Sequence, residues 1–238
     1  RRGGRITYSS SNRSYTNRLM ATYTSGVVES GWAYALSVGR RWGNEGYQDG
    51  TFYDANSFFA SVEKRINDKH SINVTGILAP NRRGKSSPNT QEVYDLKDIK
   101  YNEYWGYQDG DKRNSRVKRL VEPIVMLNHY WTISDKSDLS TSLYASWGTG
   151  GGGGAAGDYS LFNVRLGGSD QPMDLDHIVD VNRANGALGS VAYLRASRND
   201  HEWYGMLSTF KTELNDNLHL VAGVDLRTYT GKHFSEVT

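Results

Sequence analysis

Hydrophobic residues along this chain alternate with small or polar residues over many short stretches. In the clearest stretch, Trp32, Tyr34 and Leu36 alternate with Ala33 and Ser37. A period of two places alternate side chains on opposite faces of a β-strand. The pattern predicts nine strands, at about residues 5–11, 14–25, 31–42, 53–66, 71–79, 120–133, 139–148, 202–214 and 218–230.

The alternation also predicts which side chains share a face. One face should carry large apolar side chains, among them Trp32, Tyr34, Leu36, Leu139, Leu143, Leu218 and Leu220. The opposite face should carry small or polar side chains, among them Ala33, Ser37, Asn73, Ser142 and Asp225. A register shift of one residue exchanges the two sets, so this expectation is a sharp one.

The connections between the expected strands differ in length in a regular way. Short polar turns fall at residues 27–31, 66–69, 133–136 and 214–217, and three of them contain the Asn, Asp or Ser residues that favour tight turns. The intervening connections are longer, at residues 43–52, 80–118 and 149–200. The last two hold 39 and 52 residues, whereas an ordinary connection has about 4–6.

Strand length and loop placement together predict the fold class. Several expected strands are long enough to match the ~9–11 residues that a bilayer-spanning strand needs, whereas globular strands average ~5–6 residues. Short turns on one rim and long loops on the other are typical of bacterial outer-membrane barrels. We therefore expect an all-β fold, an antiparallel transmembrane β-barrel segment with short periplasmic turns and long extracellular loops. A soluble β-sandwich with two large insertions would not explain loops on one side only.

The composition agrees with strands that are apolar on one face. Hydrophobic residues make up 37% of the chain and mean hydropathy is −0.65, yet aromatic residues reach 12%. That aromatic content argues against disorder, and the lack of any run of ~18 apolar residues argues against a transmembrane helix. The absence of cysteine excludes disulfides and thiolate chemistry, and a net charge of +2 gives no reason to expect nucleic acid as a partner. Arg1 does not begin a signal peptide, so we expect a mature or truncated chain.

The low-complexity run at residues 150–154 is interpreted as a mobile loop or an incomplete stretch of sequence. Residues 148–153 match the spacing of a dinucleotide-binding glycine motif, but no helical pattern follows them, so nucleotide binding is not expected.

Aromatic residues cluster in the polar segment 94–107, and these are the candidate ligand-binding residues: Tyr94, Tyr101, Tyr104, Trp105 and Tyr107. Aromatic faces with polar edges bind sugars, peptides and other amphipathic ligands. The same rings could instead pack a large loop against its neighbours, as ordered loops require.

Charged residues near these rings allow several interpretations. Basic side chains flank the aromatic segment at Arg82, Arg83, Lys85, Lys112, Arg113, Arg116, Lys118 and Arg119. Such a rim could bind lipopolysaccharide phosphates, steer anionic solutes or simply be solvated. Asp174, Asp176 and His177 could ligate a metal or form a solvated acidic loop, and we expect no metal. No catalytic motif appears, so no catalytic residues, no cofactor and no enzymatic activity are expected.

Several segments at the loop ends resemble one family. They are SNRSY at residues 11–15, GRRW at 39–42, GTFYDA at 50–55, APNRRGK at 79–85, QEVYDL at 91–96 and WGYQDGDKRN at 105–114. These segments look like the barrel of TonB-dependent outer-membrane receptors, near the SusC-like branch. The resemblance is good from Arg5 to Trp147, weakens from Gly150 to Asp200, and returns as generic barrel strands.

The resemblance implies active import of a nutrient (a glycan, a peptide or a chelate) through a plugged barrel of ~22 strands in the outer membrane of a Gram-negative bacterium. It implies outer-membrane lipid, the TonB complex and a SusD-like surface lipoprotein as partners. Residues 1–238 would be about nine strands of that barrel, without the plug domain or a TonB box. The alternatives are a passive porin and a surface-display or adhesive barrel, and a plug domain upstream would favour import.

Overall fold

The computed structural model describes residues 2–238 and has an all-β fold built on one large antiparallel sheet. The long strands of the sheet are β1 (Gly3–Ser10), β2 (Asn17–Val27), β3 (Trp32–Gly43), β4 (Tyr53–Arg65), β5 (His70–Leu78), β10 (Ile124–Ser134), β11 (Ser137–Gly157), β13 (Ala192–Asn215) and β14 (Leu218–Val237). They pair in that order, so each long strand lies beside the next one in the chain, including across the two long loops, where β5 pairs with β10 and β11 with β13. The nine expected strands are thus confirmed.

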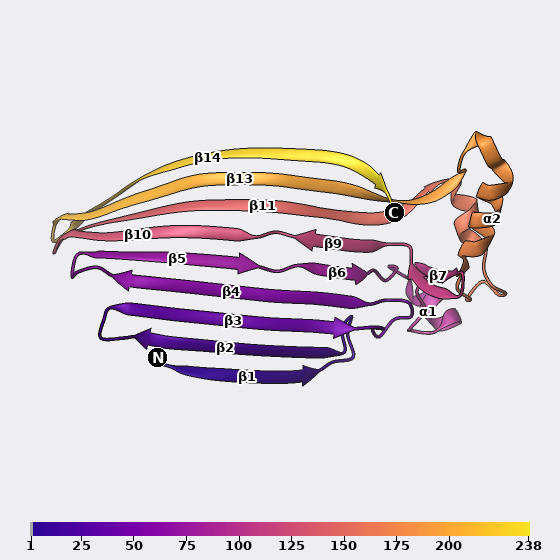
Figure 1. The fold of residues 1–238 in the computed structure, drawn as a ribbon, viewed down its shortest axis with the longest axis horizontal. Helices are drawn as coiled ribbons and strands as arrows, with labels where there is room; N and C mark the ends of the chain where they lie inside the picture. The colour runs from indigo at the N-terminus through magenta and orange to yellow at the C-terminus, as the bar shows by residue number, and fades with distance from the viewer. Residues whose placement is uncertain (1) are drawn as a thin grey trace.

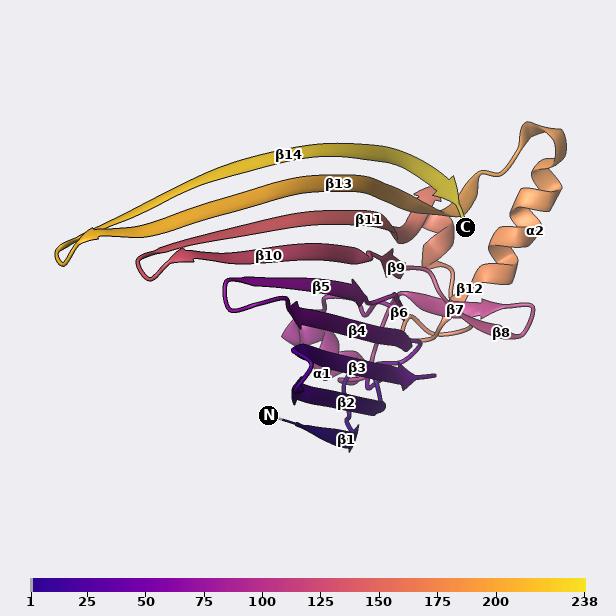
Figure 2. The same ribbon diagram turned by 60° about the vertical axis from the view of Figure 1, so that its left-hand side comes forward.

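Two short strands lengthen the middle of the sheet. β6 (Asn81–Gly84) continues β5 and pairs with β4, and β9 (Val117–Val121) precedes β10 and pairs with β6 and β11. The sheet is open, with β1 and β14 as its edge strands (Figure 1). Figure 2 shows that it twists and bends, with β13 and β14 arching along its upper edge.

The remaining elements belong to the long loops. They are α1 (Gln91–Lys97), β7 (Trp105–Gln108), β8 (Asp111–Asn114), the 3-10 turn η1 (Tyr159–Asn163), β12 (Met173–Asp174), α2 (Leu175–Asn185) and the 3-10 turn η2 (Gly186–Leu188). β12, β7 and β8 form a separate small sheet. Within residues 2–238, no helix has the length and apolar character that crossing a membrane would require.

Tight turns and long loops lie at opposite ends of the sheet, as the sequence predicts. The four tight turns join β2 to β3, β4 to β5, β10 to β11 and β13 to β14, and Figure 1 shows them together at one end. In the second of these turns, Asn67 accepts hydrogen bonds from the backbone N–H groups of Lys69 and His70, both at 2.9 Å. This side-chain bonding is why an Asn-Asp pair ends a strand so abruptly.

The predicted bounds of the loop at residues 149–200 are wrong at both ends. Residues 149–157 extend β11 and residues 192–200 extend β13, so the true connection is residues 158–191. Likewise residues 81–84 and 117–118 of the expected 80–118 loop are strand.

The glycine run at residues 150–154 is therefore not a loop, because residues 151–154 pair with β13 and residues 150–152 pair with β9. Glycine carries no side chain, so the run has no alternation to read, and its pairing is decided by neighbouring strands. At Gly148, an added Cβ would lie 2.3 Å from the imidazole of His201.

The register confirms that the two predicted sets of side chains occupy opposite faces. Directly paired residues share a face, so one row across seven strands can be traced through the register. It contains Tyr34, Val62, Val74, Leu127, Leu143, Met206 and Leu226. The adjacent row, on the opposite face, contains Ala33, Glu63, Asn73, Asn128, Ser142, Leu207 and Asp225. We call these the apolar face and the polar face.

Several side chains of the polar face hydrogen-bond one another around Asn73, although the buried hydroxyl of Ser146 on this face has no hydrogen-bond partner among the residues that the structure describes. Asn73 donates to Ser61 at 2.8 Å, Thr75 donates to Asn73 at 2.9 Å, and Asn128 donates to Asn73 at 3.1 Å. The apolar face also carries some polar pairs, such as Thr141 with Ser208 at 2.9 Å and His70 with His129 at 3.1 Å. Its large apolar side chains are exposed, with Leu143 at 45% and Leu226 at 58%.

Candidate functional site

The two long loops fold together into one unit at the loop end of the sheet, which we call the cap (residues 85–116 and 158–191). Met173 and Gly106 pair in parallel between β12 and β7. An added Cβ at Gly106 would lie 2.2 Å from the backbone oxygen of Met173, so this contact requires glycine. The backbone N–H of Asp109 donates to Asp176 at 2.8 Å, and Lys97 donates to the backbone oxygen of Ser169, also at 2.8 Å.

A small apolar core stabilises the cap. Phe162, Met173, Leu175, Ile178 and Ala192 bury one another, and Phe162 is only 7% exposed. Leu175 and Ile178 come from the first turn of α2, which Asp174 caps by accepting from the backbone N–H of His177 at 3.0 Å. The cap therefore has a small buried apolar core of its own, although other apolar side chains of the cap, such as Leu96 and Leu188, are exposed.

Asp174 and Asp176, considered above as metal ligands, have structural roles in the cap. Asp174 is the helix N-cap, and Asp176 accepts the hydrogen bond from Asp109. Among residues 2–238, no group of three or more His, Cys, Asp or Glu side chains is arranged to hold a metal ion.

The structure brings three of the five candidate aromatic residues together. Tyr101, Trp105 and Tyr107 line a cavity of about 460 Å³ between the two loops of the cap. That volume falls within the ~300–1,000 Å³ that small-molecule sites usually occupy. The rings of Trp105 and Tyr107 meet edge to face with centroids 5.5 Å apart, so their exposed faces could contact a planar or apolar group.

Tyr94 and Tyr104 are not among the residues that line this cavity. Tyr94 lies on α1, where its hydroxyl accepts a hydrogen bond from Gln48 at 3.2 Å. The ring of Tyr104 packs under the guanidinium of Arg116, whose central carbon is 4.5 Å from the ring centroid. For these two rings, the contacts are those of loop packing.

Packing also holds the three lining rings in place. Lys112 lies 4.7 Å from the ring centroid of Trp105, and Gly50 approaches the same indole so closely that a Cβ there would be 2.1 Å away. Tyr101 is 8% exposed and lies beneath Lys97, 4.5 Å from its centroid. Packing and ligand contact are therefore compatible at this site, since fixed rings lose little entropy on binding.

The other lining residues are Asp49, Lys97, Leu166, Asp170, Gln171 and Pro172. Sequence reasoning missed Leu166, Asp170, Gln171 and Pro172 because residues 166–172 lie about sixty positions from the aromatic segment and carry no motif. They add carboxylate, amide and ammonium groups beside the rings, so the cavity can hydrogen-bond a polar ligand while stacking against it.

Two carboxylates at the edge of this site have shifted pKa values. Burial alone would raise the pKa of Glu45, but hydrogen bonds from the backbone of Gly50 (3.0 Å) and from Lys112 (2.9 Å) outweigh burial and hold the pKa below its ordinary value. Burial, aided by the negative charge of Glu45, raises the pKa of Asp49. Asp49 is thus more readily protonated than an ordinary aspartate.

Comparison with known proteins adds no assignment: no protein-family model matches the chain, and no curated protein matches it.

Proposed function

We propose that this chain forms part of the wall of an outer-membrane β-barrel that imports a nutrient and is energised by TonB. The observation that carries the proposal is the sheet itself, with one face rich in large apolar side chains, an opposite polar face, tight turns at one end and a folded cap at the other. Bacterial outer-membrane barrels combine an apolar band facing lipid with a polar interior and longer extracellular loops.

Import, rather than passive flow, is supported by the family resemblance and by the cap. A cavity of about 460 Å³ lined by three rings and several polar groups suits capture of a glycan, peptide or chelate before passage. An open diffusion pore does not need such a site. The plug, the contact with TonB and any SusD-like lipoprotein belong to this proposal through the resemblance.

Orientation is tested by cysteine labelling, which has a clean background because the chain lacks cysteine. Leu96 is 84% exposed on the cap, and Lys136 is exposed in the turn between β10 and β11. On intact cells, a membrane-impermeant maleimide should label Leu96→Cys and not Lys136→Cys, and both should react after the cells are opened. Equal labelling on intact cells would contradict the orientation.

Energised import is tested separately in the same cells. Uptake of the nutrient should stop when a protonophore collapses the inner-membrane potential, or when TonB is deleted. Uptake that continues unchanged would favour a porin. Normal uptake after deletion of residues 85–116, together with lost adhesion, would favour a display barrel.

A further inference from the structure

A row of arginine residues crosses the apolar face just beyond its apolar side chains, on the side of the cap. The register places five residues in line on β4, β6, β9, β11 and β13: Asp54, Arg82, Arg119, Gly151 and Arg198. Strand alternation puts Gly151 on the same face as Leu143 and Trp147, so the row belongs to the apolar face. Arg82 and Arg119 are direct cross-strand partners.

The charges of Arg82 and Arg119 are not neutralised within the described part of the chain. Asp54 forms its ion pair with Arg40 at 3.6 Å, and Arg198 is paired with Asp200 and Glu236, each at 3.3 Å. Neither Arg82 nor Arg119 has an acidic partner within 4 Å among residues 2–238. Like charges directly opposite each other destabilise a strand pair. An anion bound between Arg82 and Arg119 would therefore reduce the electrostatic repulsion between them.

Burial and the charge of Arg119 lower the pKa of Arg82, and the carboxylate of Asp54 opposes this only in part. The guanidinium of Arg82 also lies over the ring of Phe52, 4.6 Å from its centroid, which holds the side chain in a fixed direction. Arg82 is thus a partly desolvated, oriented cation, the kind of group that binds phosphate with directed hydrogen bonds.

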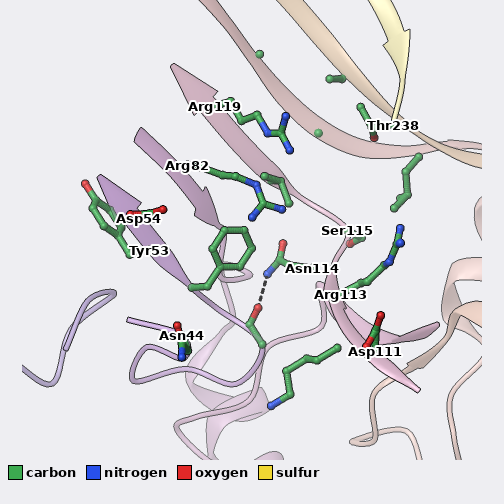
Figure 3. A pocket seen from close by; sticks show the side chains of 18 of the residues that line it. Asn44, Tyr53, Asp54, Arg82, Asp111, Arg113, Asn114, Ser115, Arg119 and Thr238 are labelled. Atoms are coloured by element: carbon green, nitrogen blue, oxygen red, sulfur yellow. Dashed lines mark hydrogen bonds between the residues drawn. The ribbon is translucent and has the colours of Figure 1, made fainter. Parts of the chain in front are cut away.

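Both guanidinium groups point into one cavity of about 900 Å³ (Figure 3). Its lining includes six basic side chains and three acidic ones, so an anion is favoured. Gly151, beside Arg119, has no side chain to fill the space. Arg113, from the β7–β8 hairpin of the cap, also lines the cavity, whereas the nearby Lys112 is paired with Glu45 at 2.9 Å.

The height of the row fits a lipid headgroup. Gly151 lies four residues beyond Trp147 on β11, which is ~13 Å along a strand and ~10 Å along the membrane normal at a barrel tilt of ~40°. If the apolar side chains up to Trp147 contact hydrocarbon, the backbone of the arginine row lies just above the polar headgroups, since that layer adds ~5–8 Å to each side of the hydrocarbon. Long arginine side chains can extend back to that layer.

We propose that Arg82 and Arg119 bind a phosphate group of a phosphorylated outer-leaflet lipid, which fixes the rim of the sheet to the surrounding membrane. The inference rests on the proposed function, because it places the apolar face in the outer membrane. The shared chemistry is a phosphate bound by two guanidinium groups. A free phosphate would use the same groups, but only a lipid places its phosphate next to an apolar face.

The test compares two double variants that remove the same number of charges from the same pair of strands. Arg82→Gln/Arg119→Gln alters the proposed site, and Arg83→Gln/Lys118→Gln alters the adjacent register pair, whose side chains are on the polar face. Each full-length protein is purified from outer membranes in detergent, and retention of diphosphorylated lipid A is measured by native mass spectrometry. Retention in the first variant should fall about tenfold or more, and retention in the second should match the wild type.

Equal retention in all three proteins would overturn the proposal, as would equal loss in both variants. A competition with inorganic phosphate distinguishes the source of the ligand. Millimolar inorganic phosphate should not displace lipid A, and full displacement would overturn the lipid assignment in favour of a soluble anion. Recovery of folded protein from the outer-membrane fraction is scored first, so a failure of the proposed function is seen separately from a failure of this site.

Discussion

The cap and the strand band between the cap and the tight turns place their apolar side chains in opposite ways. In the cap, Phe162, Leu175 and Ile178 are buried against one another. In the strand band, Val74, Leu127 and Leu143 are each more than 40% exposed on the apolar face. In water, burying apolar side chains as the cap core does is favourable, and exposing them as the strand band does is unfavourable. The two regions are therefore suited to different solvents. The cap thus has a buried apolar core, whereas the strand band presents apolar side chains on its surface.

The largest expected effect is in the cap core. Phe162→Ala should destabilise the local fold of the cap by ~3–5 kcal/mol, because the removed ring leaves a cavity among Met173, Leu175 and Ile178. Hydrogen exchange should rise in residues 158–191 while the long strands stay protected. Leu188→Ala is the matched control, since Leu188 is 87% exposed and should change nothing. Loss of the whole sheet in Phe162→Ala would show that the two regions are not independent.

Charge in the strand band should have the next largest effect, and it should depend on the face. Leu143→Arg should cost ~2–4 kcal/mol if Leu143 lies near the bilayer midplane. Ser142→Arg, one residue away on the polar face, should cost much less because its side chain points away from lipid. Equilibrium unfolding from lipid vesicles measures both. A larger cost at Ser142 than at Leu143 would reverse the assignment of the faces.

A smaller effect is expected at the cavity in the cap. Trp105→Ala should raise the KM for nutrient uptake several-fold, because a stacked ring contributes ~0.5–1.5 kcal/mol beyond its buried area. Tyr104→Ala is the control, since Tyr104 is adjacent in sequence but is not among the residues lining the cavity. An equal rise in KM in both variants, with new protease cleavage in residues 85–116, would show that the rings act only in packing.

The smallest expected effect is a pH dependence of the cap. In the folded state the pKa of Glu45 lies below its ordinary value of 4.5. Ionised Glu45 therefore stabilises the cap at pH values above about 4.5. This stabilisation is lost as the pH falls through the lowered pKa of the folded state. The ion pair with Lys112 is partly exposed, so its contribution should be below ~1 kcal/mol. Asp49 acts in the opposite sense, because its raised pKa makes the folded state less favourable as the carboxyl ionises.

Protease sensitivity of residues 85–116, measured from pH 7 to pH 3, tests both carboxylates. Glu45→Gln should flatten the rise in sensitivity below pH 4.5, and Asp49→Asn should make the cap slightly more resistant at neutral pH. Identical pH profiles in wild type and Glu45→Gln would contradict this account of the cap edge.

The strand band could be predicted from the sequence because local signals determine it. The alternation of apolar and polar residues predicted which face of the sheet each side chain occupies in strands such as β3 and β11, and Asn and Asp residues indicated the tight turns. The extension of β11 through residues 149–157 could not be predicted, because glycines carry no alternation and pair only once β13 and β9 lie beside them.

Some of the cap carried signals that the sequence analysis did not use. Asp109-Gly110 is a typical hairpin turn, and both residues have positive φ, at 52° and 78°. The capping residue Asp174 precedes apolar residues three apart, which is a helix signal. The cavity itself had no such signal, since it depends on the pairing of β12 with β7 between distant loops.

The central claim is that the apolar face contacts lipid, and site-directed spin labelling tests it most directly. Nitroxides are placed singly at residues 141–145 of β11 in the full-length protein in its membrane, and collisions with oxygen and with a water-soluble nickel complex are compared. The account predicts strict alternation, with residues 141, 143 and 145 reached by oxygen and shielded from nickel, and 142 and 144 the reverse. Access of the nickel complex to all five positions would contradict the account, because it would place the apolar face in water.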